Sequence, residues 1–270
     1  PYFAQPESYS GPELMLATVF FAFQIYCDFS AYSDIAIGTA KLFGIRLMRN
    51  FAYPYFSQSV SEFWSSWQIS LSTWFRDYVF IPLGGSRCSR GRRTANLLIT
   101  FLVSGFWHGA AWRFLVWGGV NGLAAATPRR GESCADQEIA PGGNAAIPSP
   151  VTLLRIVSTF VIICAAWIFF RAESFVDAIH ILQAIFQGIF SASGYQAVVD
   201  SFGRNRFLRT TAILLLLFVI WEWLQRRQEC PLSLCRLPVP ARWTVYTALC
   251  WMTLYWMPQT GGQEFIYFEF

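Results

Sequence analysis

The sequence predicts an all-α membrane protein, and its composition is the main reason. Apolar residues make up 54% of the 270 residues and aromatic residues 18%, including 26 Phe and 12 Trp. Charged residues are 13%, against roughly 25% in an ordinary soluble domain, so there are too few to cover a water-exposed surface. The mean hydropathy is +0.38. This composition excludes a disordered chain, a collagen, a coiled coil and a disulfide-stapled miniprotein.

The first element is an apolar run of fourteen residues, Leu14–Cys27, bounded by Pro12 and Asp28. A helix needs about 20 residues to cross a bilayer, so the run has to continue into the small residues that follow, up to Gly38. Two arrangements remain open. Either one span carries polar residues toward the protein interior, or Asp28 ends one helix and a second follows.

The second element is aromatic, and its spacing from Trp64 to Tyr78 is helical. Apolar side chains recur every three or four residues, and a polar stripe from Ser66 to Asp77 lies opposite. This pattern predicts one amphipathic helix in the membrane interface, where Trp and Tyr are favoured. A basic turn with Arg87, Arg90, Arg92 and Arg93 follows, and we expect it to lie beside the membrane and hold anionic lipid.

The third element is the thirty-residue apolar run Leu97–Ala126, interrupted by His108, Arg113 and Asn121. It exceeds one span, so it predicts either a long tilted helix or a broken pair. Residues 127–150 then change to Gly, Pro, Ala, Ser and charge without periodicity, which predicts an exposed loop.

The remaining chain predicts further helices, of which Val151–Phe170 is the clearest span because only Arg155 is charged. Phe175–Phe190 is amphipathic, and the apolar stretches Ala212–Leu224 and Trp243–Met257 complete the set. The total is about five or six membrane segments. No signal peptide precedes the first run, and because the chain starts with Pro rather than Met we expect it to be part of a longer protein.

Charge and cysteine content narrow the classes of partner. The net charge of +4 is spread along the chain and no nucleic-acid motif is present, so we expect membrane lipid as a partner and no nucleic acid. The seven cysteines are an odd number and several lie in apolar stretches, which argues against a disulfide framework. No set of residues has the spacing of a metal site, so we predict no metal.

The strongest candidate for chemistry is His108, one of only two histidines, which lies twelve residues into an apolar run. An ionisable group at that depth is costly and points to function, although a histidine bonded to a neighbouring helix would look the same. Gly105, Gly109 and Ala110 allow close approach, and Ser104 lies one turn before the ring, where it can fix the tautomer. His180 lies on an ordinary amphipathic segment, and we expect a surface role for it.

Two pairs of charged residues are weaker candidates. Asp28 and Asp34 are six residues apart, about 240° around a helix, so they do not share a face and a paired-carboxylate reaction is disfavoured. We expect them to anchor broken helices. Arg76 and Asp77 are adjacent, and we expect them to form a salt bridge between helices or to close the floor of a pocket.

Several segments resemble signatures of the membrane-bound O-acyltransferase family, and more closely its bacterial alginate O-acetyltransferase branch. They cover almost the whole chain except the 127–150 loop, and they occur in the family's order. The segments are Tyr26–Gly38 (YCDFSAYSDIAIG), Asn50–Tyr55 (NFAYPY), Phe63-Trp64, Ile69–Tyr78 (ISLSTWFRDY), Ile81–Gly85 (IPLGG), Trp107–Gly109 (WHG), Trp167–Ala172 (WIFFRA) and Phe265–Phe270 (FIYFEF).

The resemblance implies one domain over residues 1–270, lacking its N-terminal part, in which a multi-helix bundle with short interfacial or re-entrant helices surrounds a transmembrane tunnel. His108 matches the family's catalytic histidine. The implied reaction transfers an acyl group, here acetyl, to a hydroxyl of an exported polysaccharide. Acetyl-CoA or another activated acetyl group would be the donor, periplasmic acetylation proteins would be partners, and no cofactor would be bound. The implied location is the bacterial inner membrane, crossed several times.

One position departs from the family pattern. The segment Trp67–Ser72 often carries a second histidine in the family, and this chain has Gln68 there. A neutral His108, kept neutral by apolar burial, is expected to act as general base, worth about 10²–10⁴-fold in rate. Gln68, Trp64 and Trp107 carry N–H groups that can stabilise the developing oxyanion.

Two functions of other classes compete with the enzyme. A transporter or channel for a polymer or ion would use Asp28, Asp34 and His108 as a polar path. An inactive scaffold would keep the fold to assemble an acetylation complex. Acyl transfer without ion flux would favour the enzyme, and partner binding without turnover would favour the scaffold.

Overall fold

The computed structural model describes residues 2–127, 148–226 and 238–256. In these ranges the chain is helical and contains no strand, which confirms the all-α prediction. The chain consists of two compact units, Pro1–Arg226 and Arg227–Phe270. In the second unit the structure describes only helix α10 (Val239–Trp256). The prediction of a single domain stays a prediction, and most of the predicted 127–150 loop lies outside the described residues.

The first long helix, α1 (Gly11–Leu42), runs without a break past Asp28. A capping box begins it, because the backbone N–H and hydroxyl of Ser10 both donate to the Glu13 carboxylate, at 2.9 and 2.7 Å. Its buried residues all lie between Gly11 and Tyr26. The helix is therefore continuous, as the first arrangement required, and the alternative that Asp28 ends a helix is wrong. The polar residues after Tyr26 are half-buried or exposed, so they do not face the interior as that arrangement supposed.

The predicted amphipathic helix after Trp64 is not continuous. Helix α2 (Val60–Ser66) ends before Trp67, and α3 (Ile69–Phe75) starts after Gln68, whose backbone is left-handed at φ 41°. The segment at Asn50 fills the break: the Ile69 N–H donates to the Asn50 carbonyl, and the Ala52 N–H donates to the Ser66 carbonyl, each at 2.9 Å. These bonds satisfy backbone groups that a continuous helix would have paired internally, so the predicted single helix is wrong.

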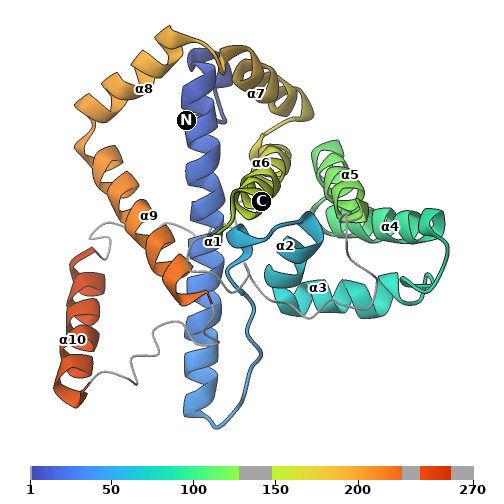
Figure 1. Cartoon of the computed structure of the whole chain (residues 1–270), viewed down its shortest axis with the longest axis horizontal. Coiled ribbons are helices and arrows are strands. Elements are labelled where there is room, and N and C mark those ends of the chain that lie inside the picture. Colours follow the sequence, from blue (N-terminus) through green and yellow to red (C-terminus); the bar gives the residue numbers. More distant parts are fainter. Residues whose placement is uncertain (1, 128–147, 227–237, 257–270) are drawn as a thin grey trace. The chain divides into compact units, whose positions relative to one another are not determined.

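The apolar run 97–126 is the broken pair that the sequence allowed. Helix α4 (Arg90–His108) turns at residues 109–111 into α5 (Trp112–Ala126), and the two lie side by side as an antiparallel hairpin (Figure 1). Glycines set their separation. A Cβ on Gly105 would lie 2.3 Å from the Phe114 carbonyl oxygen, and one on Gly118 would lie 2.3 Å from that of Phe101. Only glycine permits so close an approach of two helix backbones.

Helices α6 (Pro150–Arg171), α7 (Phe175–Gly188), α8 (Ala192–Arg204) and α9 (Arg206–Gln225) complete the first unit. In the described ranges three helices are long and apolar enough to cross a membrane, namely α1, α6 and α9, and a fourth span results if α7 and α8, bent by 105°, count as one. The sequence predicted about five or six. The difference arises because residues 97–126 are divided between α4 and α5, and because neither these helices nor α10 is both long and apolar enough to qualify as a span.

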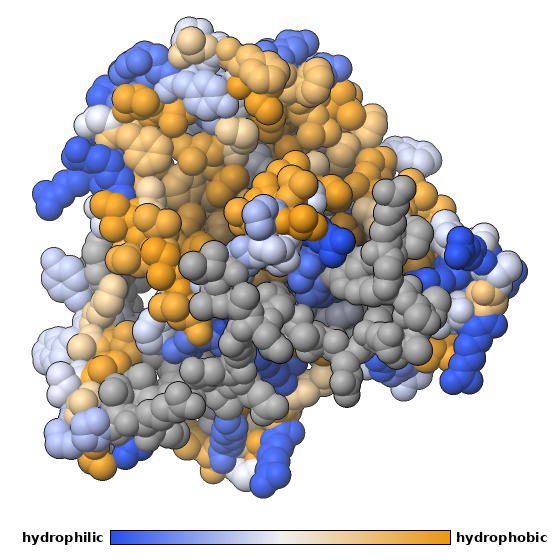
Figure 2. All heavy atoms as spheres, in the orientation of Figure 1, coloured by the Kyte–Doolittle hydropathy of each residue, from blue (hydrophilic) through white to orange (hydrophobic). Residues whose placement is uncertain are grey.

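The surface agrees with a membrane environment. Large apolar side chains of α6 and α9, among them Leu154, Val161, Leu216 and Leu224, are more than half exposed. Figure 2 shows apolar residues spread over much of the visible face, interrupted by scattered hydrophilic ones. Lipid rather than water is the solvent that such a surface matches. The interior is formed by aromatic rings, including Tyr26, Tyr55, Phe63, Trp67, Trp117 and Trp167.

Candidate functional site

His108 is the last residue of α4, and four aromatic rings surround its imidazole. We call these four residues the aromatic cage. Between ring centroids the distances from His108 are 5.0 Å to Trp107, 5.1 Å to Phe170, 5.3 Å to Trp117 and 6.5 Å to Phe114. The cage joins three helices, because Trp107 belongs to α4, Phe114 and Trp117 to α5, and Phe170 to α6.

The turn after His108 depends on Gly109. Its φ of 155° and ψ of 151° lie in a region that side chains disfavour, and a Cβ there would lie 2.6 Å from the Phe114 ring. Glycine at this position therefore lets α4 stop at His108 while Phe114 returns to the cage. The predicted role of Gly105 and Gly109 in close approach is confirmed, and the approaching groups belong to α5.

The electrostatics of the site favour a neutral imidazole. Helix α4 is not among the candidate spans, and the half-buried side chain of His108 lies among apolar rings. Burial lowers the pKa of His108 to about 4, because a low-dielectric surrounding disfavours the charged form. A histidine that is neutral at pH 7 can accept a proton. Ser104 forms no hydrogen bond with His108 in the described part of the chain, so its predicted role in fixing the tautomer has no support.

Trp64 lies one layer behind the cage, and its N–H is occupied. The indole Nε1 donates to the side-chain oxygen of Asn121 at 2.9 Å, and the Asn121 amide donates to the Trp117 carbonyl at 2.8 Å. The oxyanion role expected for Trp64 stays a prediction, and in the folded chain its N–H already has this partner. Asn121 is fully buried, and sequence reasoning did not assign it a role. The sequence did contain a sign of this role, because Asn121 interrupts an apolar run and a buried amide requires a hydrogen-bond partner.

Gln68 lies at the break between α2 and α3, where its carbonyl accepts a hydrogen bond from the Ser72 N–H at 3.0 Å. No ring contact or hydrogen bond joins Gln68 to His108 among the described residues. The neighbouring Trp67 does reach toward the cage, because its ring lies 5.3 Å from that of Trp167, which in turn lies 5.4 Å from Phe170. The role of Gln68 stays a prediction.

Arg76 and Asp77 pair with each other. The Arg76 Nε lies 2.8 Å from the Asp77 Oδ1, both side chains are exposed, and the pair belongs to the short π-helical turn Arg76–Phe80. The hydrogen bond from Arg76 lowers the pKa of Asp77. The predicted salt bridge between helices is therefore wrong. The preceding Phe75 places this turn near the site, since its ring lies 6.4 Å from Trp107.

Asp28 and Asp34 lie on α1, where Asp28 is half-buried and Asp34 exposed. Neither carboxylate bonds to the other or to the cage in the described residues. We predicted that they anchor broken helices, and this prediction is wrong because α1 is continuous. His180 is exposed on α7, in agreement with its expected surface role.

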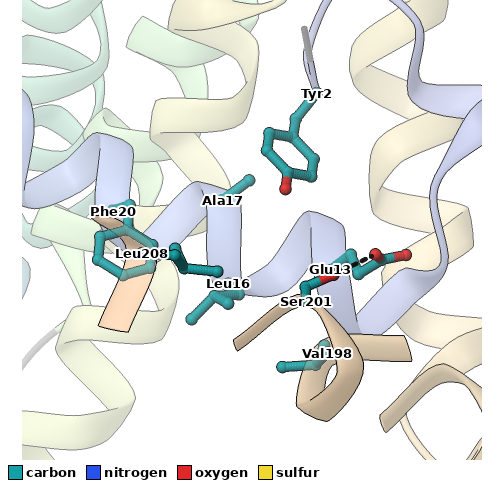
Figure 3. Close-up of a pocket in the computed structure, with 8 residues that line it drawn as sticks. All are labelled: Tyr2, Glu13, Leu16, Ala17, Phe20, Val198, Ser201 and Leu208. Carbon is teal, nitrogen blue, oxygen red and sulfur yellow. Dashed lines mark hydrogen bonds between the residues drawn. The ribbon is translucent and has the colours of Figure 1, made fainter. Parts of the chain in front are cut away.

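A shallow cleft lies elsewhere, where the start of α1 meets α8 and α9 (Figure 3). Leu16, Ala17, Phe20, Val198 and Leu208 give it an apolar lining. Glu13 and Ser201 stand at its edge, joined by a weak hydrogen bond of 3.5 Å. None of its lining residues belongs to the aromatic cage. Among the described residues no three His, Cys, Asp or Glu side chains gather as a metal site, and the prediction of no metal stays a prediction.

An all-helical chain with several candidate membrane spans, and with one neutral histidine caged at the tip of a glycine-packed hairpin, defines a helical membrane protein with a histidine-centred site. Residues 8–127, which include α1 to α5 and His108, match the sequence model of the membrane-bound O-acyltransferase family.

Curated acyltransferases are similar to the chain as well. The chain is 43% identical over 171 residues to a "probable alginate O-acetylase" of Pseudomonas aeruginosa, a match that covers 63% of this chain and 31% of the relative. It is 36% identical over 183 residues to a peptidoglycan O-acetyltransferase of Helicobacter pylori, covering 68% and 33%. It is 36% identical over 110 residues to a teichoic acid D-alanyltransferase of Streptococcus thermophilus, covering 38% and 26%. The chain spans about a third of the length of the first two relatives.

Proposed function

We propose that this chain is the His108-bearing part of a membrane O-acyltransferase that transfers acetyl groups to hydroxyls of an exported, alginate-like polysaccharide. The observation that carries the proposal is a neutral histidine in an aromatic cage, on a segment that matches the O-acyltransferase family model. The names of two relatives support the acetyl group and the cell-surface polymer, since one is a "probable alginate O-acetylase" and the other a peptidoglycan O-acetyltransferase.

His108 acts as the general base in this proposal. The acceptor hydroxyl oxygen forms a bond to the acyl carbon while the imidazole nitrogen takes the hydroxyl proton, and the carbonyl electron pair moves onto the acyl oxygen. The oxyanion then collapses, the bond to the leaving group of the donor breaks, and the imidazolium returns its proton to that leaving group. Base catalysis of this kind contributes about 10²–10⁴-fold.

The remaining parts of the proposal rest on the resemblance to the O-acyltransferase family. The donor is acetyl-CoA or another activated acetyl compound that acts as co-substrate, and no bound cofactor is required. The acceptor is a polysaccharide, with periplasmic acetylation proteins as further partners. The location is the bacterial inner membrane, crossed several times by helices such as α1, α6 and α9.

The test is acetylation of the polymer in a deletion strain complemented with the complete protein. We expect His108→Gln to abolish acetylation, because glutamine accepts a hydrogen bond but takes no proton at neutral pH. His180→Gln is the matched control, since His180 is the other histidine and lies exposed on α7. Immunoblotting of membranes has to show equal amounts of both variants. Normal acetylation with His108→Gln would refute the base assignment, and an unchanged polymer with the wild-type protein would refute the proposed function.

A further inference from the structure

The ring of Trp117 forms one wall of the aromatic cage, and its N–H has no hydrogen-bond partner among the described residues. Trp117 is only 1% exposed, and its Nε1 is buried without a hydrogen bond in the described part of the chain. Buried donors are nearly always paired, because an unpaired one loses its bond to water and gains nothing in return. The other tryptophan of the cage, Trp107, is 52% exposed, so its ring carries no such cost.

The position of this donor is fixed by its neighbours. The rings of Trp117 and His108 lie 5.3 Å apart and nearly perpendicular, at 83°. On its other sides the indole contacts Trp64 at 5.4 Å and stacks on Trp167 at 6.2 Å and 29°. The Asn121 amide bonds to the Trp117 carbonyl and holds its backbone. The indole is therefore a rigid wall of the cage that carries one free hydrogen-bond donor.

We propose that the N–H of Trp117 donates a hydrogen bond to the acyl carbonyl oxygen and stabilises the negative charge that forms there during transfer. This inference rests on the proposed function, since His108 must act on the attacking hydroxyl. The acyl carbon has to lie within reach of that hydroxyl, so its carbonyl oxygen lies in the same cage as the imidazole. A donor that is already desolvated and held in place needs little reorganisation when the charge develops. The donor stays unpaired in the folded chain because its partner arrives with the substrate.

Trp167 provides a matched control. Its Nε1 is also buried, but it faces the Tyr55 hydroxyl, and its ring stacks on Trp117. No ring contact joins Trp167 to His108 among the described residues. The substitutions Trp117→Phe and Trp167→Phe remove the same atoms from neighbouring positions of one cluster, so their packing losses are comparable. They differ in whether the lost N–H belongs to a ring that touches His108.

The experiment measures acetyl transfer by the complete protein in proteoliposomes, with the wild type, His108→Gln, Trp117→Phe and Trp167→Phe compared at equal membrane abundance. We expect Trp117→Phe to lower kcat about 10²-fold with little change in KM, the typical loss of one oxyanion donor, and Trp167→Phe to change kcat much less. Equal losses in the two variants, or no loss in either, would overturn the inference while an inactive His108→Gln left the proposed function standing.

A second substitution covers the case in which Trp117→Phe does not accumulate in the membrane. Incorporation of 3-benzothienylalanine at position 117 replaces the N–H with sulfur and keeps nearly the same outline. This variant should fold and should show the same loss of kcat. A wild-type kcat with benzothienylalanine would overturn the inference regardless of the behaviour of Trp117→Phe.

Discussion

The phenolic hydroxyl of Tyr26 donates a hydrogen bond to the carboxylate of Glu222, with 2.5 Å between the two oxygens. Tyr26 lies in α1 and is 3% exposed, and Glu222 lies in α9 and is 8% exposed. The bond joins two candidate membrane spans that are 196 residues apart in sequence. A buried acidic group in a span has to be paired, and Tyr26 is the partner that pairs it.

Loss of the Tyr26 hydroxyl is expected to destabilise this junction. Tyr26→Phe leaves the Glu222 carboxylate with one partner fewer, which should cost about 1–3 kcal/mol. Tyr78→Phe is the control, because that side chain is 68% exposed and its loss should be nearly neutral. Thermal unfolding of the purified protein in detergent measures both variants. Equal melting temperatures for Tyr26→Phe and the wild type would show that the bond adds nothing.

The bond between Trp64 and Asn121 gives a second stability prediction. Asn121→Leu should leave the Trp64 N–H unpaired, and Trp64→Phe should leave the Asn121 oxygen unpaired, each at a cost of about 1–3 kcal/mol. The double variant should cost less than the sum of the two, because neither partner then remains unpaired. A double-mutant cycle of unfolding free energies checks this, and strict additivity would contradict the assigned bond.

The glycine hairpin predicts opposite effects for two glycines. Gly105→Ala places a methyl group 2.3 Å from the Phe114 carbonyl oxygen, so α4 and α5 must separate and the cage must distort. We expect loss of acetyl transfer and lower stability. At Gly119, in α5, a Cβ meets nothing within 4 Å, and alanine should raise helix stability by up to about 1 kcal/mol. Melting temperatures and activity are measured together, and an active, stable Gly105→Ala protein would argue against the close approach.

Gln68 combines a left-handed backbone with a position where the family often has histidine. If its side chain only bonds substrate or neighbours, Gln68→His should be tolerated, and Gln68→Ala should lose about 1–3 kcal/mol of transition-state stabilisation. Gln68→Gly separates the two features, because glycine accepts the φ of 41° without strain and also lacks the side chain. We expect Gln68→Gly to be at least as stable as Gln68→Ala but equally impaired in acetyl transfer. Turnover that occurs only with histidine would instead favour the inactive scaffold for the native chain.

The pH dependence of acetyl transfer follows from the low pKa of His108. The base is the neutral imidazole, so activity should persist from pH 8 downward and fall only as the pH approaches about 4, rather than near the ordinary value of 6.5. Initial rates of the complete protein in proteoliposomes, measured after checking its integrity at each pH, provide the test. A decline centred near pH 6.5 would show that the imidazole is more solvated than the cage indicates.

The sequence predicted the helical class and the main candidate residue because both depend on composition and local pattern. His108 stands out as an ionisable group in an apolar run, and the excess of Phe and Trp requires lipid or a large aromatic core. These signals need no knowledge of tertiary contacts. The length of the run 97–126 left both a long tilted helix and a broken pair open, and the structure shows the break between His108 and Trp112.

What the sequence did not predict depends on contacts between distant segments. The break at Gln68 arises because Asn50 offers backbone partners, and the periodicity of residues 64–78 contains no sign of this. The occupation of the Trp64 N–H by Asn121 and the partner of Glu222 likewise join residues far apart in the chain. Arg76 and Asp77 paired locally because adjacent side chains on an exposed turn reach each other without a partner helix.

The length of α1 determines where its polar end must lie. At 1.5 Å per residue its 32 residues extend over about 48 Å, and even at a steep tilt of about 40° they would span about 37 Å along the bilayer normal. The hydrocarbon layer is about 30 Å thick, so part of α1 has to emerge from it. The apolar, buried residues up to Tyr26 favour the interior, which leaves the end with Asp34 and Lys41 to emerge. The signature segment Tyr26–Gly38 therefore crosses the boundary between hydrocarbon and headgroups, where a protein can meet both a lipid-embedded and a water-borne molecule.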